Sequence, residues 1–264
     1  MLRISKRPVA AALVLASVLP LAACASGGAK TRADTQYVAR DVNTLYSLAK
    51  KRLDQRRYAE AAAIFDEVER QHPYSVWARR AQLMSAFSYY ASKDYTKSTE
   101  SARRFLAIHP GNRDAPYAHY LIALNFYEQI EDVNRDQSIT RQALDSLNEL
   151  VRRYPNTRYA SDARLKVDLV RDHLAGKEME IGRFYQRRGQ WLASVTRFRT
   201  VIDEYQTTSH TPEALMRLTE TYLALGIPEQ ARASAAVLGA NYPNSKWYER
   251  AYALVQRHAS APAA

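Results

Sequence analysis

The residues that could do chemistry are few, and their spacing does not fit a catalytic or metal site. None of the six histidines forms an i,i+4 pair or an H-E-x-x-H sequence, the spacing with which a helix presents two imidazoles to zinc. The chain has one cysteine, no G-x-S-x-G and no glycine-rich phosphate loop. The histidines are His72, His109, His119, His173, His210 and His258. The sequence therefore predicts a binding protein that is not an enzyme and has no catalytic residues, no cofactor and no metal.

The one cysteine, Cys24, stands directly after an N-terminal segment typical of secretion. A basic start precedes an apolar stretch, Val9–Pro20, and the residues Leu21-Ala22-Ala23-Cys24 match the bacterial lipobox, in which the cysteine is lipidated and becomes the mature N-terminus. The alternative is an ordinary secretory signal that happens to end before a cysteine. The next residue is Ala25 and not the aspartate that retains many lipoproteins in the inner membrane. We therefore expect a lipid anchor in the outer membrane, with the folded chain on its periplasmic face.

Composition divides the 264 residues into five parts. We assign residues 1–23 to a lipoprotein signal peptide and residues 24–34, which are small, polar and glycine-bearing, to a flexible lipid-anchored tether. Residues 35–158 and 159–257 form N-terminal and C-terminal repeat halves, and residues 258–264 a disordered tail. No apolar run reaches the roughly 18 residues that a membrane-spanning helix needs.

A recurring pattern of small and bulky residues predicts that the two halves are entirely helical. An aromatic or similar residue is followed by a small one three positions on, a bulky one four later, and usually a proline eight beyond. The small residues of the five copies are Ala61, Ser98, Ala143, Ser194 and Ala231. This resembles the tetratricopeptide repeat, in copies about one helical turn longer than the usual 34 residues. Because small residues let helices approach to about 8 Å, we predict an all-α, tetratricopeptide-like solenoid of about five helical hairpins.

The junctions between hairpins carry capping signals. The run Pro73-Tyr74-Ser75-Val76-Trp77 recurs at residues 155–159 and 243–247, with proline ending one helix and Ser or Thr placed to N-cap the next. At the second junction, Asp114 or Asn112 is the expected cap.

The same reasoning predicts helix boundaries and one insertion. We expect helices over about 35–55 and 58–71, and a long helix over about 161–188 that joins the two halves. Residues 131–137 interrupt the period of the third hairpin, so we predict an inserted loop there, with Asp136 as the cap of the following helix.

The chain is basic, with a formal charge of +11, of which the signal segment carries three positive charges and no negative ones. The pair Arg152-Arg153 lies at a helix end, where it complements the helix dipole, whereas Arg79-Arg80 comes early in its helix and gains nothing there. The latter pair is therefore the better functional candidate, and a solvated helix face is the alternative. For a lipoprotein facing the periplasm, acidic protein surface, lipid phosphate or a peptide carboxylate are suitable partners, and we expect no nucleic acid.

The lipobox followed by these hairpins resembles the BamD (ComL) family of outer-membrane assembly lipoproteins. Further matching stretches are residues 134–136 in the inserted loop and 180–193, and the resemblance covers about residues 34–257. It departs at Gln206, where the fourth copy lacks its closing proline. The resemblance implies a non-enzymatic component of the β-barrel assembly machinery. Such a component binds unfolded outer-membrane precursors, docks on the periplasmic domains of BamA beside other lipoproteins, and promotes insertion into the outer membrane. Arg197 matches the family arginine that faces BamA; an exposed arginine on the outer face of the second helix of a hairpin is the alternative.

In tetratricopeptide folds the first helix of each hairpin lines the concave surface at i, i+3, i+4 and i+7. On the first three hairpins this spacing selects an aromatic groove with two cations nearby, whereas the later hairpins give polar residues. Bacterial β-barrel precursors typically end in an aromatic residue with a free carboxylate, which rings and a cation would bind. We expect two or three of these aromatic residues to pack between repeats instead. The groove residues are Tyr46, Lys50, Arg80, Phe87, Tyr90, Tyr117, Tyr120 and Tyr127.

Two other functions stay open at this point. One is a different periplasmic repeat lipoprotein, such as a cell-division or peptidoglycan coordinator or a pilus-assembly pilotin, since these share the Tyr-Pro-x-Ser junctions. The other is a solute-binding lipoprotein for a sugar or peptide. That class needs a deep closed pocket, for which five short hairpins leave little sequence.

Overall fold

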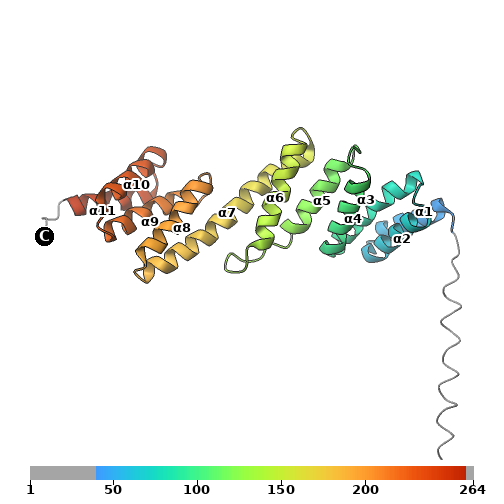
Figure 1. The fold of residues 1–264 in the computed structure, drawn as a ribbon, viewed down its shortest axis with the longest axis horizontal. Coiled ribbons are helices and arrows are strands. Elements are labelled where there is room, and N and C mark those ends of the chain that lie inside the picture. The colour runs from blue at the N-terminus through green and yellow to red at the C-terminus, as the bar shows by residue number, and fades with distance from the viewer. Residues whose placement is uncertain (1–39, 260–264) are drawn as a thin grey trace, which may run out of the picture. The chain divides into compact units, whose positions relative to one another are not determined.

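The structure is a computed structural model that describes residues 40–259, and within them it contains α-helices and no strands. The helices follow one another along the row in Figure 1. They are α1 (Val42–Asp54), α2 (Tyr58–Gln71), α3 (Val76–Ala91), α4 (Tyr95–Ile108), α5 (Ala115–Tyr127), α6 (Ser138–Arg153), α7 (Arg158–Arg187), α8 (Trp191–Glu204), α9 (Thr211–Ala224), α10 (Pro228–Asn241) and α11 (Lys246–Ala259). The predicted signal peptide, Cys24 and the tether lie outside the described residues.

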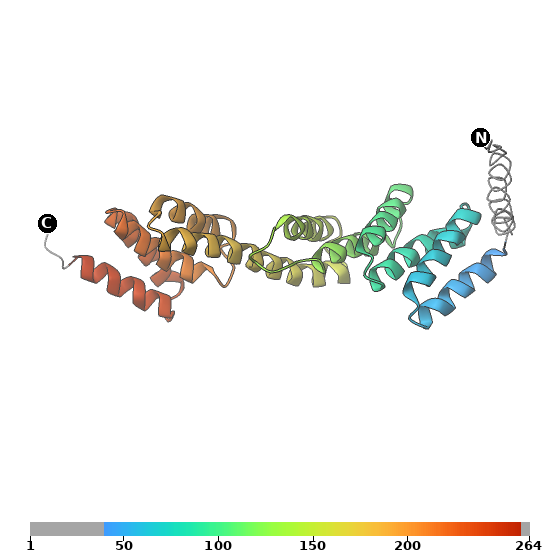
Figure 2. The same ribbon diagram turned by 90° about the horizontal axis from the view of Figure 1, so that it is seen from below.

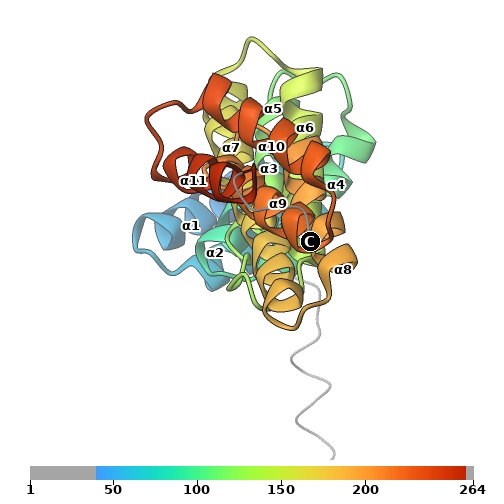
Figure 3. The same cartoon turned by 90° about the vertical axis from the view of Figure 1, so that its left-hand side faces the viewer.

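Ten of these helices form the five predicted hairpins, α1–α2 to α9–α10, and α11 packs on α9 and α10. Each hairpin also packs on the next one along the chain, as the turned view in Figure 2 shows. Seen from the C-terminal end, α9, α10 and α11 lie in front of the earlier hairpins (Figure 3). The predicted all-α solenoid is therefore confirmed.

The core is a row of clusters, one at each junction between neighbouring hairpins, and not a single centre. The small and bulky residues of the repeat pattern supply it: Ala61 and Phe65 are fully buried between α1, α2 and α3, and Phe198 is buried between α7, α8 and α9. Each hairpin hides its apolar face only against its neighbours, so the stability of such a fold is approximately a sum of local terms.

The predicted Ser and Thr caps are present, whereas neither Asp114 nor Asp136 makes the capping bond of an N-cap residue. Ser75 accepts a hydrogen bond from the Ala78 amide at 3.0 Å, and Thr157 accepts one from Ala160 at 3.2 Å. Asp136 lies one residue before the N-cap of α6, which is Gln137, and accepts a hydrogen bond from the Ser138 amide at 3.0 Å. Asp114 occupies the N-cap position of α5 without capping it, whereas the Asn112 side chain accepts from the Asp114 amide at 2.8 Å.

Two predicted boundaries need correction. The first helix begins at Val42 and not near residue 35, since Arg40 and Asp41 are not helical. Val42 packs against the first cluster, and a short helix in water persists mainly where a face is packed. At the other end, α11 continues to Ala259, so the tail predicted from residue 258 begins inside a helix. Arg257 and His258 are cations in its last turn, where they favour the helix.

The long helix α7 was predicted and is confirmed, including the two glycines within it. It packs on α6 at one end and on α8 at the other, so it belongs to both halves of the chain. At Gly182 an added Cβ would lie 2.4 Å from Cε1 of Phe198, which explains a glycine inside a helix. Within the described residues, none of the helices combines the length and apolar character needed to cross a membrane.

Candidate functional site

The first helices of the N-terminal hairpins bring several of the predicted groove residues together. The Tyr46 ring lies 4.6 Å from the ring of Trp77 and 5.5 Å from that of Phe65, measured between centroids. The guanidinium of Arg80 lies 5.7 Å from the centre of the Trp77 ring. We call Tyr46, Trp77 and Arg80 the Trp77 group. It combines aromatic surface with an exposed cation, the two features expected of a site for an aromatic carboxylate.

A second aromatic group lies two hairpins further on, around a residue that the groove prediction did not include. The ring of Tyr159, at the start of α7, lies 5.4 Å from Tyr117 and 5.3 Å from Tyr120, both on α5. Arg158 covers the Tyr159 ring at 4.9 Å and donates a hydrogen bond to its hydroxyl at 2.9 Å. We call Tyr117, Tyr120, Tyr159 and Arg158 the Tyr159 group. The recurring aromatic of the junction run marked Tyr159 in the sequence, but only as a packing residue.

Two tyrosine hydroxyls in this part of the N-terminal half donate hydrogen bonds to carboxylates. Tyr120 donates its hydroxyl proton to Asp162 at 2.5 Å, and Tyr90 donates to Glu128 at 3.3 Å. Burial, together with the Glu128 carboxylate, raises the pKa of Tyr90 to about 12, and burial raises the pKa of Tyr120 above its usual range. The phenols therefore stay protonated and act as hydrogen-bond donors. A second carboxylate entering here would be repelled by Glu128 and Asp162.

The aromatic groove residues are more deeply packed than predicted. All six of them contact the hydrophobic clusters between hairpins, whereas the expectation was that two or three would do so. None falls among the exposed large hydrophobics of the described residues, so each offers only part of its ring to a ligand. The six are Tyr46, Phe87, Tyr90, Tyr117, Tyr120 and Tyr127.

The two predicted cations differ in their surroundings. Lys50 is well exposed, and the contact that the structure shows for it is an ion pair with Asp54 at 3.9 Å on the same helix. Arg80 lies instead on an aromatic ring of the Trp77 group. The geometry therefore favours Arg80 over Lys50 as the cation that would meet a bound carboxylate.

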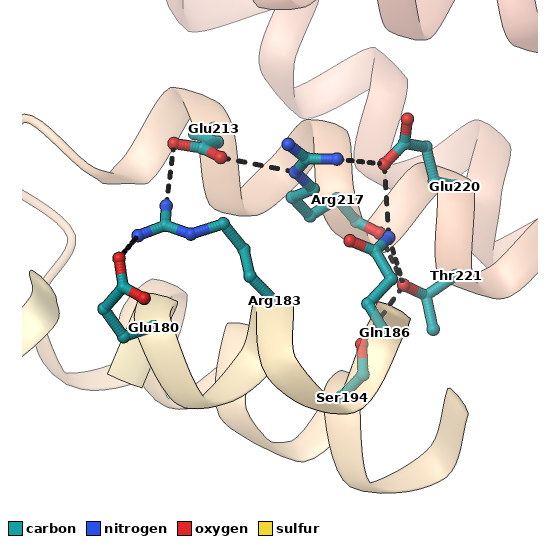
Figure 4. A network of polar contacts seen from close by, with 8 residues as sticks. All are labelled: Glu180, Arg183, Gln186, Ser194, Glu213, Arg217, Glu220 and Thr221. Atoms are coloured by element: carbon teal, nitrogen blue, oxygen red, sulfur yellow. Dashed lines mark hydrogen bonds and ion pairs between the residues drawn. The ribbon is translucent and has the colours of Figure 1, made fainter. Parts of the chain in front are cut away.

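The corresponding face of the C-terminal half is occupied by a polar network (Figure 4). Glu213 on α9 accepts from Arg183 on α7 at 3.2 Å and from Arg217 at 3.3 Å. Gln186 on α7 reaches both Glu220 and Thr221 on α9, at 3.1 and 3.2 Å.

Most of these groups are partly buried, so the network ties the two helices together through hydrogen bonds and ion pairs. The predicted polar residues of the later hairpins thus bind one another. Glu180, Arg183, Gln186, Ser194, Glu213, Arg217, Glu220 and Thr221 are the eight residues drawn in Figure 4.

Arg197, predicted to face a partner protein, has an internal partner as well. Its Nη1 lies 3.0 Å from Oε2 of Glu178 on α7, and the Glu178 side chain is only 16% exposed. Arg197 itself is 40% exposed, so one side of its guanidinium faces solvent. Sequence spacing did not reveal this pair because the two residues are 19 positions apart on different helices.

Two of the histidines, His119 and His210, contact neighbouring side chains of the fold. His119 is half-buried beside Tyr154, and this burial, together with nearby Arg153, lowers its pKa. His210 lies 3.7 Å from Asp172 and approaches the backbone at Gly176. Over the described range, no three histidine, cysteine, aspartate or glutamate side chains are grouped as a metal site would require.

Comparison with known proteins finds a family model and curated relatives that match most of the chain. Residues 38–238 match the family model YfiO, described as an outer membrane lipoprotein. The chain is 51% identical to the outer membrane protein assembly factor BamD of Caulobacter vibrioides over 96% of this chain and 83% of that protein. It is 44% identical to BamD of Rickettsia prowazekii, over 92% of this chain and 97% of that one. Among solved structures, a thermophilic TPR protein of Thermus thermophilus covers 82% of this chain and 100% of its own, at 19% identity and a TM-score of 0.38.

Proposed function

The chain belongs to the family of outer membrane lipoproteins that includes the BamD assembly factors, and from this premise we propose that it binds unfolded outer-membrane protein precursors and docks on BamA for their insertion. The observation that carries the proposal is the identity of half the residues to an assembly factor over nearly the whole chain. Assembly of this kind requires binding surfaces and no bond-making chemistry, in keeping with a non-enzymatic role.

The precursor site of this proposal is the aromatic face of the N-terminal hairpins. A precursor that ends in an aromatic residue would place its ring against the Trp77 group and its terminal carboxylate on Arg80. The preceding residues would continue toward the Tyr159 group, where protonated phenols and Arg158 offer donors to a peptide backbone. This orientation is favoured because Glu128 and Asp162 would repel the carboxylate at the other end.

The C-terminal half is the proposed docking surface for BamA and for the other lipoproteins of the Bam complex. The polar network joins α7 to α9 in this half (Figure 4), and Arg197 on α8 is paired with Glu178 on α7. A cation that is held by Glu178 but half open to solvent is positioned for a carboxylate on a partner, because its orientation is already restrained.

Arg197→Glu is expected to reduce co-purification with BamA at least tenfold, since reversing a charge in an interface pair places like charges against each other. The internal pair requires a matched control. The double variant Arg197→Glu with Glu178→Arg keeps an internal ion pair of reversed direction and still presents the wrong charge to BamA. Both variants should lose BamA in a pull-down. Recovery of BamA by the double variant would show that Arg197 acts only inside the chain.

The lipid anchor is proposed at Cys24. Replacing Cys24 by serine removes the sulfur that would carry the lipid, so the variant is expected to leave the outer-membrane fraction and to incorporate no labelled fatty acid. Cell fractionation with metabolic palmitate labelling measures both. A Cys24→Ser protein that stays labelled and membrane-bound would contradict the anchor.

The assembly function itself is tested by depletion. Loss of the protein is expected to lower the amount of folded porin in the outer membrane and to raise unfolded porin in the periplasm. Normal porin levels together with defective septation or loss of pili would support one of the other repeat lipoproteins instead.

A further inference from the structure

A surface at the N-terminal end of the fold is not used by either binding role. Among the described residues, large hydrophobic side chains that are well exposed are few, and three of them sit at two consecutive connections between hairpins. Tyr74 is fully exposed in the α2–α3 connection, Val76 is 67% exposed at the start of α3, and Ile108 is 55% exposed at the end of α4. Leaving such side chains in water is unfavourable, so their grouping indicates a contact surface.

Two of these three residues share one hollow in the surface, and Val76 lies between two lining residues of the chain, Ser75 and Ala78. Tyr74 and Ile108 both line it, together with Arg79 and His109, so the α2–α3 and α4–α5 connections lie next to each other. Figure 1 shows the α4–α5 and α6–α7 connections on one edge of the row of hairpins. The helix ends and the connections form the outer edge of the hairpins. Such an edge can insert only shallowly into a flat surface such as a membrane.

The charge around the hollow is predominantly basic. Arg79 lines the hollow and is exposed, and the structure shows no ion pair between it and another described residue. Arg113 is 87% exposed and lies 3.9 Å from Asp114. The carboxylate that lines the hollow, Glu69, forms an ion pair with Arg104 at 3.2 Å and accepts a hydrogen bond from Gln82.

The start of the fold lies on the same side. α2 runs back along α1, so the first residues of α1 are beside the α2–α3 connection, and Val42 packs with Val68 and Trp77 in one cluster. Asp41 follows Cys24 by only 17 positions (41 − 24), a length of chain that spans at most about 60 Å when fully extended. With the proposed lipid at Cys24, the membrane is therefore within reach of this edge.

From these observations we propose that Tyr74, Val76 and Ile108, with Arg79 and Arg113, form a second membrane contact that binds anionic phospholipid. Tyrosine and arginine suit the boundary between headgroups and acyl chains, and basic residues near an anionic surface add attraction that decays within about one Debye length. The contact orients the N-terminal hairpins on the bilayer, whereas the lipid holds the chain there. The orientation of the N-terminal hairpins on the bilayer depends on the proposed anchor at Cys24, but the binding of phospholipid by this contact does not.

The test uses the chain from residue 24 onward with Cys24→Ser, which removes any acyl group. This chain contains the whole compact unit Val42–Ala264, so the contacts described within that unit are kept. Co-flotation is measured with vesicles of phosphatidylethanolamine and phosphatidylglycerol and with neutral phosphatidylcholine vesicles. We expect the protein to bind the anionic vesicles with a partition coefficient at least tenfold higher than for the neutral ones. This binding should weaken as the salt concentration is raised.

Two pairs of substitutions separate the apolar and basic contributions. Tyr74→Ser with Ile108→Ser, and separately Arg79→Ser with Arg113→Ser, should each lower the partition coefficient at least fivefold, with unchanged thermal midpoints because all four side chains are exposed. Leu165→Ser with Leu169→Ser removes two well-exposed leucines on α7 and should leave the partition coefficient unchanged.

The proposal is overturned if the unaltered protein binds neither vesicle, if it binds both equally, or if the variant with Tyr74→Ser and Ile108→Ser binds like the unaltered protein. None of these outcomes would affect the depletion phenotype, so failure here is distinct from failure of the assembly function.

Discussion

Replacing Gly182 by alanine is expected to lower the free energy of unfolding by about 2–3 kcal/mol, although the same change usually stabilises a helix. The new Cβ would lie 2.4 Å from Cε1 and 2.8 Å from Cδ1 of Phe198. Phe198 is completely buried among Ala175, Met179 and Val201, so its ring has no space to move into. Either α7 and α8 separate or the ring takes a strained rotamer, and both outcomes open the interface between them.

Thermal unfolding followed by circular dichroism measures this effect, which corresponds to a fall in the midpoint on the order of 5–10 °C for a domain of this size. Gly111→Ala is the matched control, because no atom lies within 4 Å of the added Cβ there. A second variant tests the mechanism: Phe198→Leu combined with Gly182→Ala should recover part of the loss. Equal midpoints for Gly182→Ala and Gly111→Ala would mean that the close approach of the two helices is not a constraint.

A peptide with a C-terminal phenylalanine is expected to bind the N-terminal half, and amidation of its carboxylate should weaken binding by about 1–3 kcal/mol, the scale of a lost charged hydrogen bond. Arg80→Gln should abolish this preference for the free acid, because Arg80 is the cation that lies on the Trp77 ring. Fluorescence anisotropy with the acid and the amide of the same peptide measures the difference directly.

Neighbouring cations provide the controls for this prediction. Lys50→Gln and Arg79→Gln remove exposed positive charges near the same hairpins but not from the Trp77 group, so both should keep the preference for the acid. A loss of preference in all three variants would indicate a general attraction to positive charge. Equal binding of acid and amide by the unaltered protein would rule out carboxylate capture.

The structure also changes which aromatic substitution is informative. Alanine at Tyr90 and Tyr120 together would be expected from the sequence to abolish crosslinking to such a peptide without unfolding the chain. Both rings contact hydrophobic clusters, and the Tyr120 hydroxyl donates to Asp162, so the double variant would also lose packing and one of the two donors to Asp162, the other being Lys166. Phenylalanine at both positions keeps the rings and removes only the hydroxyl donors, and is therefore the sharper test of their part in binding.

The sequence alone was sufficient for the features that are set within one hairpin. The spacing of Ala61 and Phe65 predicted buried positions in α2, Ser75 and Thr157 were recognised as caps, and the inserted loop and long α7 were placed correctly. These features depend on helix periodicity and on hydrogen bonds across three or four residues, which any helix imposes on its own sequence.

Only the tertiary structure decided which side chains meet across neighbouring helices. Periodicity predicts which face of a helix a residue occupies. Whether Tyr159 and Asp162 on α7 reach Tyr120, or Arg197 on α8 reaches Glu178, depends on the crossing angle and relative height of the two helices. The same holds for Tyr74 and Ile108, which are 34 positions apart (108 − 74) and share one hollow only because successive connections stack. The number and type of the hairpins are thus determined by short-range sequence patterns. The binding surfaces are determined by how the hairpins pack on one another.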